Sequence, residues 1–318
     1  MTTVLITAIA GDIAQAIATI IREEFPRWRV IGCDMHTRHG GTLVTDALFL
    51  APAASAPNYD AWIAELVQEQ QVDICIPMSE AELAHFAAGG HTHVGRAKLL
   101  MPNARAIEVG ADKLTTARHL VATGCPAPWT VPADDPGAAV QFPCIFKPRR
   151  SAGSKGVIVC GNAEDARYLI SRYPPAVFQE LLLPEDQEVT CAIYRTRDGR
   201  IAIAQLLRRL TGGFTGWAEI IDDTEIRRQC EQLAISLDLW GPINAQLRRT
   251  PAGPRIFEIN ARFSSTVLMR HRLGYQDVVW AVRETMGERV ELTTPAPGAV
   301  VVRTQGAAVL PTVAQSRA

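Results

Sequence analysis

Apolar and polar residues alternate most regularly between Arg255 and Phe263, in the sequence RIFEINARF. Successive side chains of a β-strand point to opposite faces, so a spacing of two places side chains on the same face. Glu258, Asn260 and Arg262 have this spacing, and apolar residues fill most of the positions between them. The pattern predicts a strand that presents a carboxylate, an amide and a guanidinium on one face.

The stretch before this strand alternates in the same way, and the sequence Thr-Pro-Ala-Gly-Pro between the two favours a turn. A hairpin centred near Ala252 places Gln246 opposite Glu258 and Asn244 opposite Asn260 on a shared face. Their oxygen atoms are of the kind that a hard cation such as Mg²⁺ prefers. An ordinary solvated strand face shows the same alternation, so the pattern alone leaves both interpretations open.

Strand and helix patterns alternate in the first hundred residues, which predicts a parallel sheet covered by helices. The predicted elements are a strand at 4–8, a helix at 13–24, a strand at 29–33, a helix at 60–70, a strand at 72–76 and a helix from Ser79. A dinucleotide site at the first turn is not supported, because Gly11 is the only glycine there and the Rossmann fingerprint needs more. The segment Met78–Glu82 is a better candidate for substrate contact, although Ser79 is equally explained as a helix N-cap.

A second unit is predicted to begin with a helix that Asp112 caps. Two short strands follow, at Pro143–Lys147 and Val157–Cys160, and the loop between them is rich in serine and glycine. Backbone amides in such a loop can close over phosphate oxygens. The spacing is not that of a Walker loop, and a plain mobile hairpin accounts for the pattern as well.

Further strands are predicted at 176–182, 189–195 and 200–209. Asp198 and Gly199 favour a tight hairpin between the last two. The sequence TGGFTG at Thr211–Gly216 predicts a mobile loop, and a helix is expected from about Asp223 to Leu239.

The charges are balanced, with 32 Lys and Arg against 33 Asp and Glu. This balance argues against a nucleic-acid partner. No apolar run is long enough to span a bilayer, so no membrane partner is expected. The seven cysteines are widely spaced and form no C-x-x-C pair, which favours buried thiols in a reducing, cytoplasmic compartment.

Taken together, these motifs have the order and spacing of the ATP-grasp superfamily, and the chain most resembles its carbamoyl-phosphate-synthase-like and carboxylate-amine ligase branch. The resemblance spans about Ala111 to Gly274. It implies an α/β fold, of the α+β ATP-grasp type: a Rossmann-like parallel-sheet domain at 1–110, a small subdomain with a mobile lid at 111–187, and a large subdomain with the metal site at 188–318. The motifs that carry the resemblance are Lys113, Lys147, the lid sequence SAGSKG, the hinge FQELL, Glu188, Gln246 and the strand EINAR.

The resemblance also implies roles for individual residues. Lys113 and Lys147 match the cations that hold the ATP phosphates, while Glu188 matches the residue that takes the ribose hydroxyls. The lid is matched by Ser151, Gly153, Ser154, Lys155 and Gly156, and the adenine-binding hinge by Glu180, Leu181 and Leu182. Glu258 matches the bridge between two Mg²⁺ ions, for which Mn²⁺ can substitute, with Gln246 and Asn260 as the flanking ligands. Arg262 matches the residue that stabilises a phosphorylated carboxylate.

The implied reaction is ATP-dependent activation of a small carboxylate as an acyl phosphate, which an amine then attacks to form an amide. Charge neutralisation and alignment are the main requirements of phosphoryl transfer, and metals and cations supply them. Two alternatives stay open: carboxyphosphate or carbamate chemistry on the same scaffold, and a nucleotide-binding regulatory protein without turnover. The resemblance favours a homodimer.

Some positions depart from the family pattern. Lys155 is charged where many relatives have glycine, and a serine pair follows Arg262 where a glycine pair is frequent. In the run Met269–Leu273, three cationic residues are expected to lie on a solvated helix face, with contact to an acidic substrate as the alternative. These are Arg270, His271 and Arg272.

Overall fold

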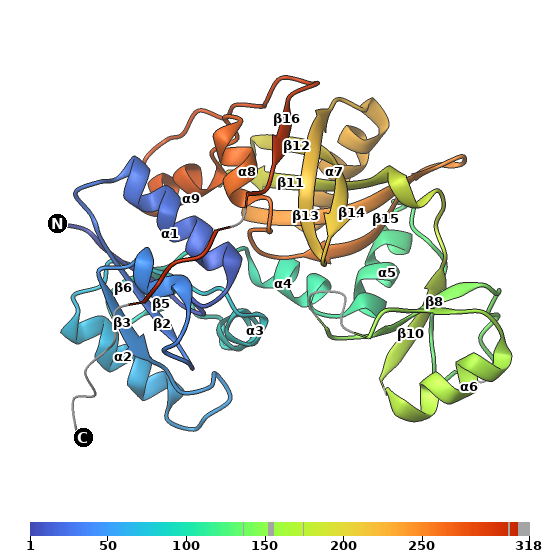
Figure 1. Ribbon diagram of the computed structural model, residues 1–318, viewed down its shortest axis with the longest axis horizontal. Helices are drawn as coiled ribbons and strands as arrows, with labels where there is room; N and C mark the ends of the chain where they lie inside the picture. Colours follow the sequence, from blue (N-terminus) through green and yellow to red (C-terminus); the bar gives the residue numbers. More distant parts are fainter. Residues whose placement is uncertain (136, 152–155, 174, 305, 311–318) are drawn as a thin grey trace. The chain divides into compact units, whose positions relative to one another are not determined.

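The computed structural model describes residues 1–135, 137–151, 156–173, 175–304 and 306–310. The chain forms two compact units (Figure 1). Unit 1 contains residues 1–101, 278–289 and 303–318, and unit 2 contains residues 102–277 and 290–302. The finer division of the chain at 110 and 187 stays a prediction.

Unit 1 is built on a six-stranded sheet with the order β3-β2-β1-β4-β6-β5, parallel except for the β5–β6 pair. Its strands are β1 (Thr3–Ile6), β2 (Arg29–Asp34), β3 (Ala47–Leu50), β4 (Ile74–Ile76), β5 (His93–Val94) and β6 (Ala97–Leu99). Its helices are α1 (Asp12–Glu24), the short η1 (Gly40–Leu43), α2 (Tyr59–Glu69), α3 (Glu80–Ala88) and most of α9 (Asp277–Thr285). The predicted parallel sheet is confirmed.

Side chains at the carboxyl ends of these strands hold the turns of unit 1. Asp34 accepts hydrogen bonds from backbone amides of two neighbouring turns. Ser79 and Glu82 form the two halves of a capping box at the start of α3. The buried Glu82 carboxylate also accepts hydrogen bonds from Thr7 Oγ1 and Tyr59 OH, each at 2.6 Å. In this structure Ser79 and Glu82 of the Met78–Glu82 segment therefore serve the fold.

Unit 2 contains a four-stranded antiparallel sheet with the order β7-β10-β8-β9. Its elements are β7 (Thr130–Pro132), β8 (Cys144–Pro148), β9 (Ile158–Cys160), α6 (Ala163–Arg172) and β10 (Ala176–Glu180). Cys144, Phe146, Cys160 and Phe178 form the centre of its small core, against which α6 packs. The predicted β8–β9 hairpin is confirmed.

A six-stranded antiparallel sheet, with the order β15-β14-β11-β12-β13-β16, forms the rest of unit 2. Its strands are β11 (Glu188–Arg195), β12 (Ile201–Thr211), β13 (Phe214–Ile221), β14 (Gly241–Thr250), β15 (Gly253–Asn260) and β16 (Val300–Val302). The remaining elements of unit 2 are α4 (Ala104–Gly110), α5 (Lys113–Ala122), η2 (Glu185–Gln187), α7 (Thr224–Ser236) and α8 (Val267–Arg272).

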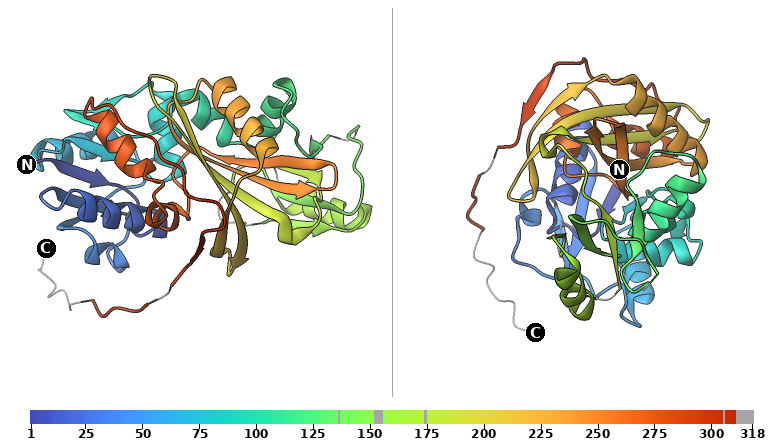
Figure 2. Two further views of the ribbon diagram at one scale, coloured as in Figure 1. Left: turned by 90° about the horizontal axis from the view of Figure 1, so that it is seen from above. Right: turned by 90° about the vertical axis from the view of Figure 1, so that its right-hand side faces the viewer.

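Helix α7 covers one face of the six-stranded sheet (Figure 2). Gln205 of β12 donates to the Asp223 carbonyl that precedes α7, and Gln229 of α7 donates to the Pro254 carbonyl, both at 3.0 Å. Side chains at alternate positions of the strands point to the opposite face. That opposite face carries the candidate site.

One predicted loop is a hairpin. Thr211–Gly216 was expected to be a mobile loop, but Thr211 pairs with Phe214 across a two-residue turn between β12 and β13. Gly212 and Gly213 have φ values of 59° and 85°, which a type I′ turn requires and glycine adopts without strain. The sequence prediction of a loop was wrong because Gly-Gly was taken as a flexible segment and not as a turn.

Candidate functional site

The β14–β15 hairpin places the predicted metal ligands as the sequence indicated. Gln246 pairs with Glu258, and Asn244 pairs with Asn260. The register shifts by one residue next to Gln246, because Phe257 is an extra residue in β15. This β-bulge brings Glu258 opposite Gln246, since an uninterrupted pairing from the turn would place Phe257 there.

Lys147 lies on β8 and its side chain is buried. Its ammonium group donates to Gln179 Oε1 at 2.7 Å and stands 4.9 Å from the centre of the Phe257 ring. Burial and the positive charge of Lys113 lower the pKa of Lys147 from 10.5 to about 8, although Glu258 acts in the opposite direction. These effects show that Lys147 lies within electrostatic range of Glu258 and Lys113.

Lys113 begins helix α5 and contacts the start of the predicted lid. Its Nζ donates to the Ser151 carbonyl at 2.9 Å and to Ser151 Oγ at 3.2 Å. Asp112 caps α5, as predicted, and also forms an ion pair with Arg149 at 2.8 Å. Gly156 ends the loop with φ of 73°. Three predicted lid residues lie outside the described residues: Gly153, Ser154 and Lys155.

The predicted hinge follows β10. Glu180 Oε2 accepts from the Trp129 amide at 3.3 Å and faces Arg255 Nη1 at 3.4 Å. The Leu182 carbonyl accepts from Arg248 Nη1 at 2.7 Å. That carbonyl is therefore engaged, and so is the backbone amide of Glu180, which donates to the Trp129 carbonyl at 2.9 Å. The adenine contacts predicted for Glu180, Leu181 and Leu182 stay a prediction.

Two arginines hold Glu188 at the start of β11. Arg208 Nη2 lies 2.7 Å from Glu188 Oε1, and Arg248 Nη2 lies 2.9 Å from Oε2. The side chains of Glu188 and Arg208 are only 13% and 8% exposed, so water screens their attraction weakly. Arg208 Nη2 also donates to Gln246 Oε1 at 3.0 Å. The predicted ribose-binding carboxylate and a predicted metal ligand thus share one guanidinium.

Sequence reasoning missed Arg208, Arg248 and Phe257. Arg248 has the same spacing of two from Gln246 as Gln246 has from Asn244, so the alternation contained a signal for it. The hairpin at Asp198 and Gly199 contained a signal for Arg208, which lies across from Glu188. Phe257 gave none, because it reaches Lys147 only through the bulge.

Arg262 follows β15, and its Nη1 donates to the Phe263 carbonyl at 3.1 Å. Arg270 lies further along and is 1% exposed, so the expected solvated helix face was wrong for it. It forms an ion pair with Asp277 at 2.6 Å and donates to Ser264 and Thr266. These contacts occupy its guanidinium, so Arg270 is not available to an acidic substrate in this structure. His271 is also buried, whereas Arg272 is exposed.

The Arg270–Asp277 pair gives a prediction for stability. Asp277→Ala leaves a buried guanidinium without its counter-charge, and such changes cost about 3–5 kcal/mol of unfolding free energy. Asp222→Ala, which removes the exposed partner of Arg227, is the control and is expected to cost less than about 1 kcal/mol. Urea unfolding measures both. If both variants lose less than about 1 kcal/mol of unfolding free energy, the buried Arg270–Asp277 pair contributes no more to stability than an exposed pair.

The residues at the β15 end of the site fit a hard cation. Glu258 and Asn260 supply carboxylate and amide oxygens, and Asn260 Nδ2 donates to Glu258 Oε1 at 3.1 Å. This contact orients the amide and leaves its oxygen available to a cation. Within the described residues, no three His, Cys, Asp or Glu side chains gather as a metal site. A cation here therefore needs amide or phosphate oxygens as further ligands.

The comparisons with known proteins concern part of the sequence and the fold. Residues 174–307 match a family model described as ATP-grasp in the biosynthetic pathway with Ter operon. No curated protein matches the sequence. Solved structures match the fold over most of the chain. N5-carboxyaminoimidazole ribonucleotide synthetase from Thermus thermophilus is 17% identical, with a TM-score of 0.75 over 94% of this chain and 82% of that chain.

Two other solved structures have different activities in their names. The L-amino acid ligase from Bacillus licheniformis is 14% identical, with a TM-score of 0.69 over 90% of this chain and 74% of that chain. The biotin carboxylase domain of the Hydrogenobacter thermophilus 2-oxoglutarate carboxylase, in complex with MgADP and bicarbonate, is also 14% identical; its TM-score is 0.73 over 94% of this chain and 73% of that chain. This chain has the ATP-grasp fold.

The ATP-grasp family match covers eight of the predicted site residues, which are Glu180, Leu181, Leu182, Glu188, Gln246, Glu258, Asn260 and Arg262. Lys113, Lys147 and the predicted lid precede the match. Lys113 and Lys147 lie on α5 and β8 of the same unit. The described helices of the chain include none that is both long and apolar enough to cross a bilayer.

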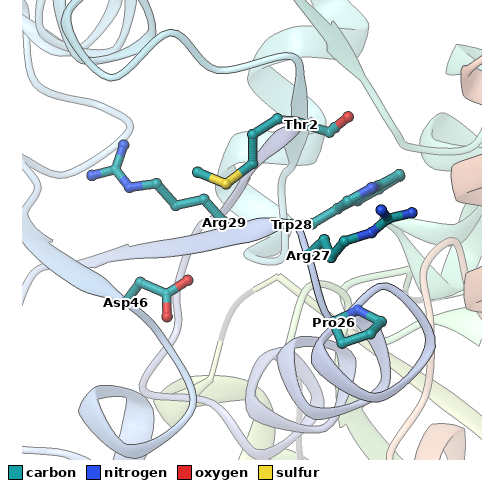
Figure 3. A pocket seen from close by; sticks show the side chains of 7 residues that line it. Thr2, Pro26, Arg27, Trp28, Arg29 and Asp46 are labelled. Atoms are coloured by element: carbon teal, nitrogen blue, oxygen red, sulfur yellow. The ribbon is translucent and has the colours of Figure 1, made fainter.

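A hollow of about 920 Å³ lies in unit 1 (Figure 3). It is lined by Met1, Thr2, Pro26, Arg27, Trp28, Arg29 and Asp46. These residues surround the amino ends of β1 and β2, whereas ligands of parallel sheets bind at the carboxyl ends. Asp46 is already paired with Arg22 at 2.6 Å. We therefore assign no role in the reaction to this hollow.

Proposed function

We propose that this chain is an Mg-ATP-dependent ligase that activates a carboxylate as an acyl phosphate and joins it to an amine. The observation that carries the proposal is the position of Lys147. Its ammonium group, on one sheet of unit 2, stands against Phe257 and within electrostatic range of Glu258 on the other sheet. A phosphate-binding cation and a metal-binding carboxylate therefore converge, as phosphoryl transfer requires.

Each residue has a defined task in this reaction. Lys113 and Lys147 bind the phosphates, and the ammonium of Lys113 exchanges its present contact with Ser151 for a phosphate oxygen. Glu258 and Asn260 hold Mg²⁺, which when bound neutralises and aligns the phosphate oxygens. Glu188 binds the ribose, with its carboxylate held in position by Arg208 and Arg248.

The γ-phosphoryl group passes from ATP to the carboxylate and ADP leaves, and Arg262 stabilises the negative charge of the acyl phosphate and of the tetrahedral intermediate that follows it. The amine then attacks the carbonyl carbon, phosphate leaves, and the amide forms. The family resemblance implies a lid over the bound nucleotide, and such a lid would exclude the water that otherwise hydrolyses the acyl phosphate.

Support also comes from the named relatives in fold, which include an L-amino acid ligase and a ribonucleotide synthetase. The family model places its ATP-grasp members in a biosynthetic pathway. A small-molecule donor and acceptor, and a cytoplasmic site of action as a homodimer, form part of the proposal.

The test is ADP release with Mg-ATP across pools of amino acids and small carboxylates, with and without hydroxylamine. Hydroxamate formation with one pool is expected, because hydroxylamine traps an acyl phosphate. A parallel arm with and without bicarbonate identifies carboxyphosphate chemistry, for which ADP release depends on bicarbonate. Tight nucleotide binding with no ADP release in any pool contradicts the ligase proposal and favours a regulatory protein.

A further inference from the structure

Arg208 lies on the site face of β12 and connects two parts of the candidate site. Its Nε and Nη2 donate to Glu188 Oε1 at 3.0 and 2.7 Å, and Nη2 also donates to Gln246 Oε1 at 3.0 Å. Only 8% of its side chain is exposed. The guanidinium therefore occupies the space between the residue that takes the ribose and the residue expected to bind a second cation.

This contact determines which atom of Gln246 faces the interior of the site. Arginine has only N–H donors, so the amide must turn its oxygen, and not its nitrogen, toward Arg208. A cation on the same oxygen lies about 2.1 Å from it, hence within about 5 Å of the guanidinium nitrogen. Two positive groups this close repel one another in a buried site, where water screens them weakly.

The other charges of the site also favour a single cation, bound near Glu258. The Glu188 carboxylate already has Arg208 and Arg248 as counter-charges. Glu258, by contrast, has no ion pair within 4.0 Å among the described residues and contacts the amide of Asn260. One carboxylate is thus available for a divalent cation, and the opposite side of the site is already positively charged.

We propose that this site binds one divalent cation, held by Glu258 and Asn260, and that Arg208 takes the place of a second ion beside Gln246. The inference rests on the proposed nucleotide-binding function. The phosphates receive positive charge from one metal ion on the β15 side and from the Arg208 guanidinium on the β12 side. Arg208 is then a nucleotide-binding residue, and Gln246 orients it without binding metal.

The first test counts Mn²⁺ ions bound per chain at saturating AMP-PNP, by dialysis and electron paramagnetic resonance. We expect one ion with the six-line signal of an isolated Mn²⁺ in the wild type. Two ions with a spin-coupled signal, as for metals about 4 Å apart, would overturn the proposal. Failure of AMP-PNP to bind at all would instead count against the proposed function.

The second test changes the arginine. Arg208→Met is expected to weaken AMP-PNP binding at least tenfold, or to allow a second Mn²⁺ on the freed Gln246 oxygen. Arg209→Met is the matched control, because Arg209 is the next residue of β12, is exposed and points to the opposite face. If both variants match the wild type in nucleotide affinity and Mn²⁺ count, Arg208 does not replace an ion.

A third variant keeps the proposal testable if Arg208→Met fails to fold. Gln246→Ala leaves Arg208 in place and removes Gln246 Oε1, the oxygen that would bind a second cation. On the present proposal it still binds one Mn²⁺ per chain, with an affinity within about threefold of the wild type. Loss of an ion, or a tenfold weaker Mn²⁺ affinity, would identify Gln246 as a ligand and overturn the proposal.

Discussion

Lys147→Met is expected to give a protein that is more stable than the wild type at pH 7 but binds ATP poorly. Lys147 is charged and buried, and its pKa falls from 10.5 to about 8. A pKa lowered by this much means that the buried charge reduces the free energy of unfolding by about 3 kcal/mol. Methionine removes that cost but also the hydrogen bond to Gln179, worth about 1 kcal/mol. A net gain of about 2 kcal/mol follows.

The sign of the pH dependence follows from the same pKa. Below pH 8 the folded and unfolded states both carry the proton, so the full cost of the buried charge is present. Between pH 8 and 10.5 only the unfolded state keeps the proton, and the wild type becomes relatively more stable. The advantage of the variant should therefore be constant below pH 8 and shrink as pH rises to 10.5. Urea unfolding of both proteins across this range measures the difference.

The cost to function follows from the phosphate contact. A charged hydrogen bond in a buried site is worth about 2–3 kcal/mol, which weakens ATP binding roughly 30- to 150-fold. Lys98→Met is the control, because Lys98 is an exposed lysine of unit 1 whose Nζ donates to the Thr285 carbonyl. Calorimetric titration with AMP-PNP compares the three proteins. Unchanged affinity in Lys147→Met would remove its phosphate role, and a loss of stability would contradict the pKa argument.

The hairpin of the site was predictable because three local signals agreed. The alternation of polar and apolar residues predicted which side chains share a face of the hairpin, and the Pro and Gly residues predicted the position of the turn. The cross-strand pairs follow from these two. The pairing of Gln246 with Glu258 nevertheless depends on the Phe257 bulge. The expected turn centre at Ala252 lay half a residue beyond the real one, and the bulge compensated for that difference. The right register was therefore reached without knowledge of the bulge.

The contacts between strands distant in sequence were not predictable in the same way. Arg208 and Glu188 are 20 residues apart, and whether two such side chains meet depends on the whole β11–β12 register. Arg270 has the sequence context of a solvated helix, with His271 and Arg272 beside it. Its burial depends on Asp277, which becomes a partner only when the chain turns back after α8. The periodicity of a sequence predicts which residues share a face of an element, but it does not predict which other part of the chain covers that face.

Glu258→Gln is expected to lower ADP release by roughly 10³-fold or more while the protein stays folded. The glutamine keeps an oxygen for the hydrogen bond from Asn260 Nδ2, so the hairpin is not disturbed. It removes the carboxylate that is proposed to hold the cation, and a neutral amide holds Mg²⁺ far less well. Loss of a single stabilising group at a charged transition state costs about 10²–10³-fold in rate, and loss of a metal costs more.

Two measurements separate this loss from a loss of fold or of nucleotide. Mn²⁺ affinity in the presence of AMP-PNP should fall at least 30-fold, whatever the substrate is. ADP release with the pool that stimulates the wild type should fall in parallel. Glu219→Gln is the control. Glu219 of β13 pairs with Leu207 of β12, so the two side chains lie on the same face of the sheet. Because successive side chains of a strand point to opposite faces, this is the face opposite Arg208. The Mn²⁺ affinity and the rate of ADP release of Glu219→Gln should stay within about twofold of the wild type. If Glu258→Gln retains more than a tenth of the wild-type rate, Glu258 is not the carboxylate that holds the metal.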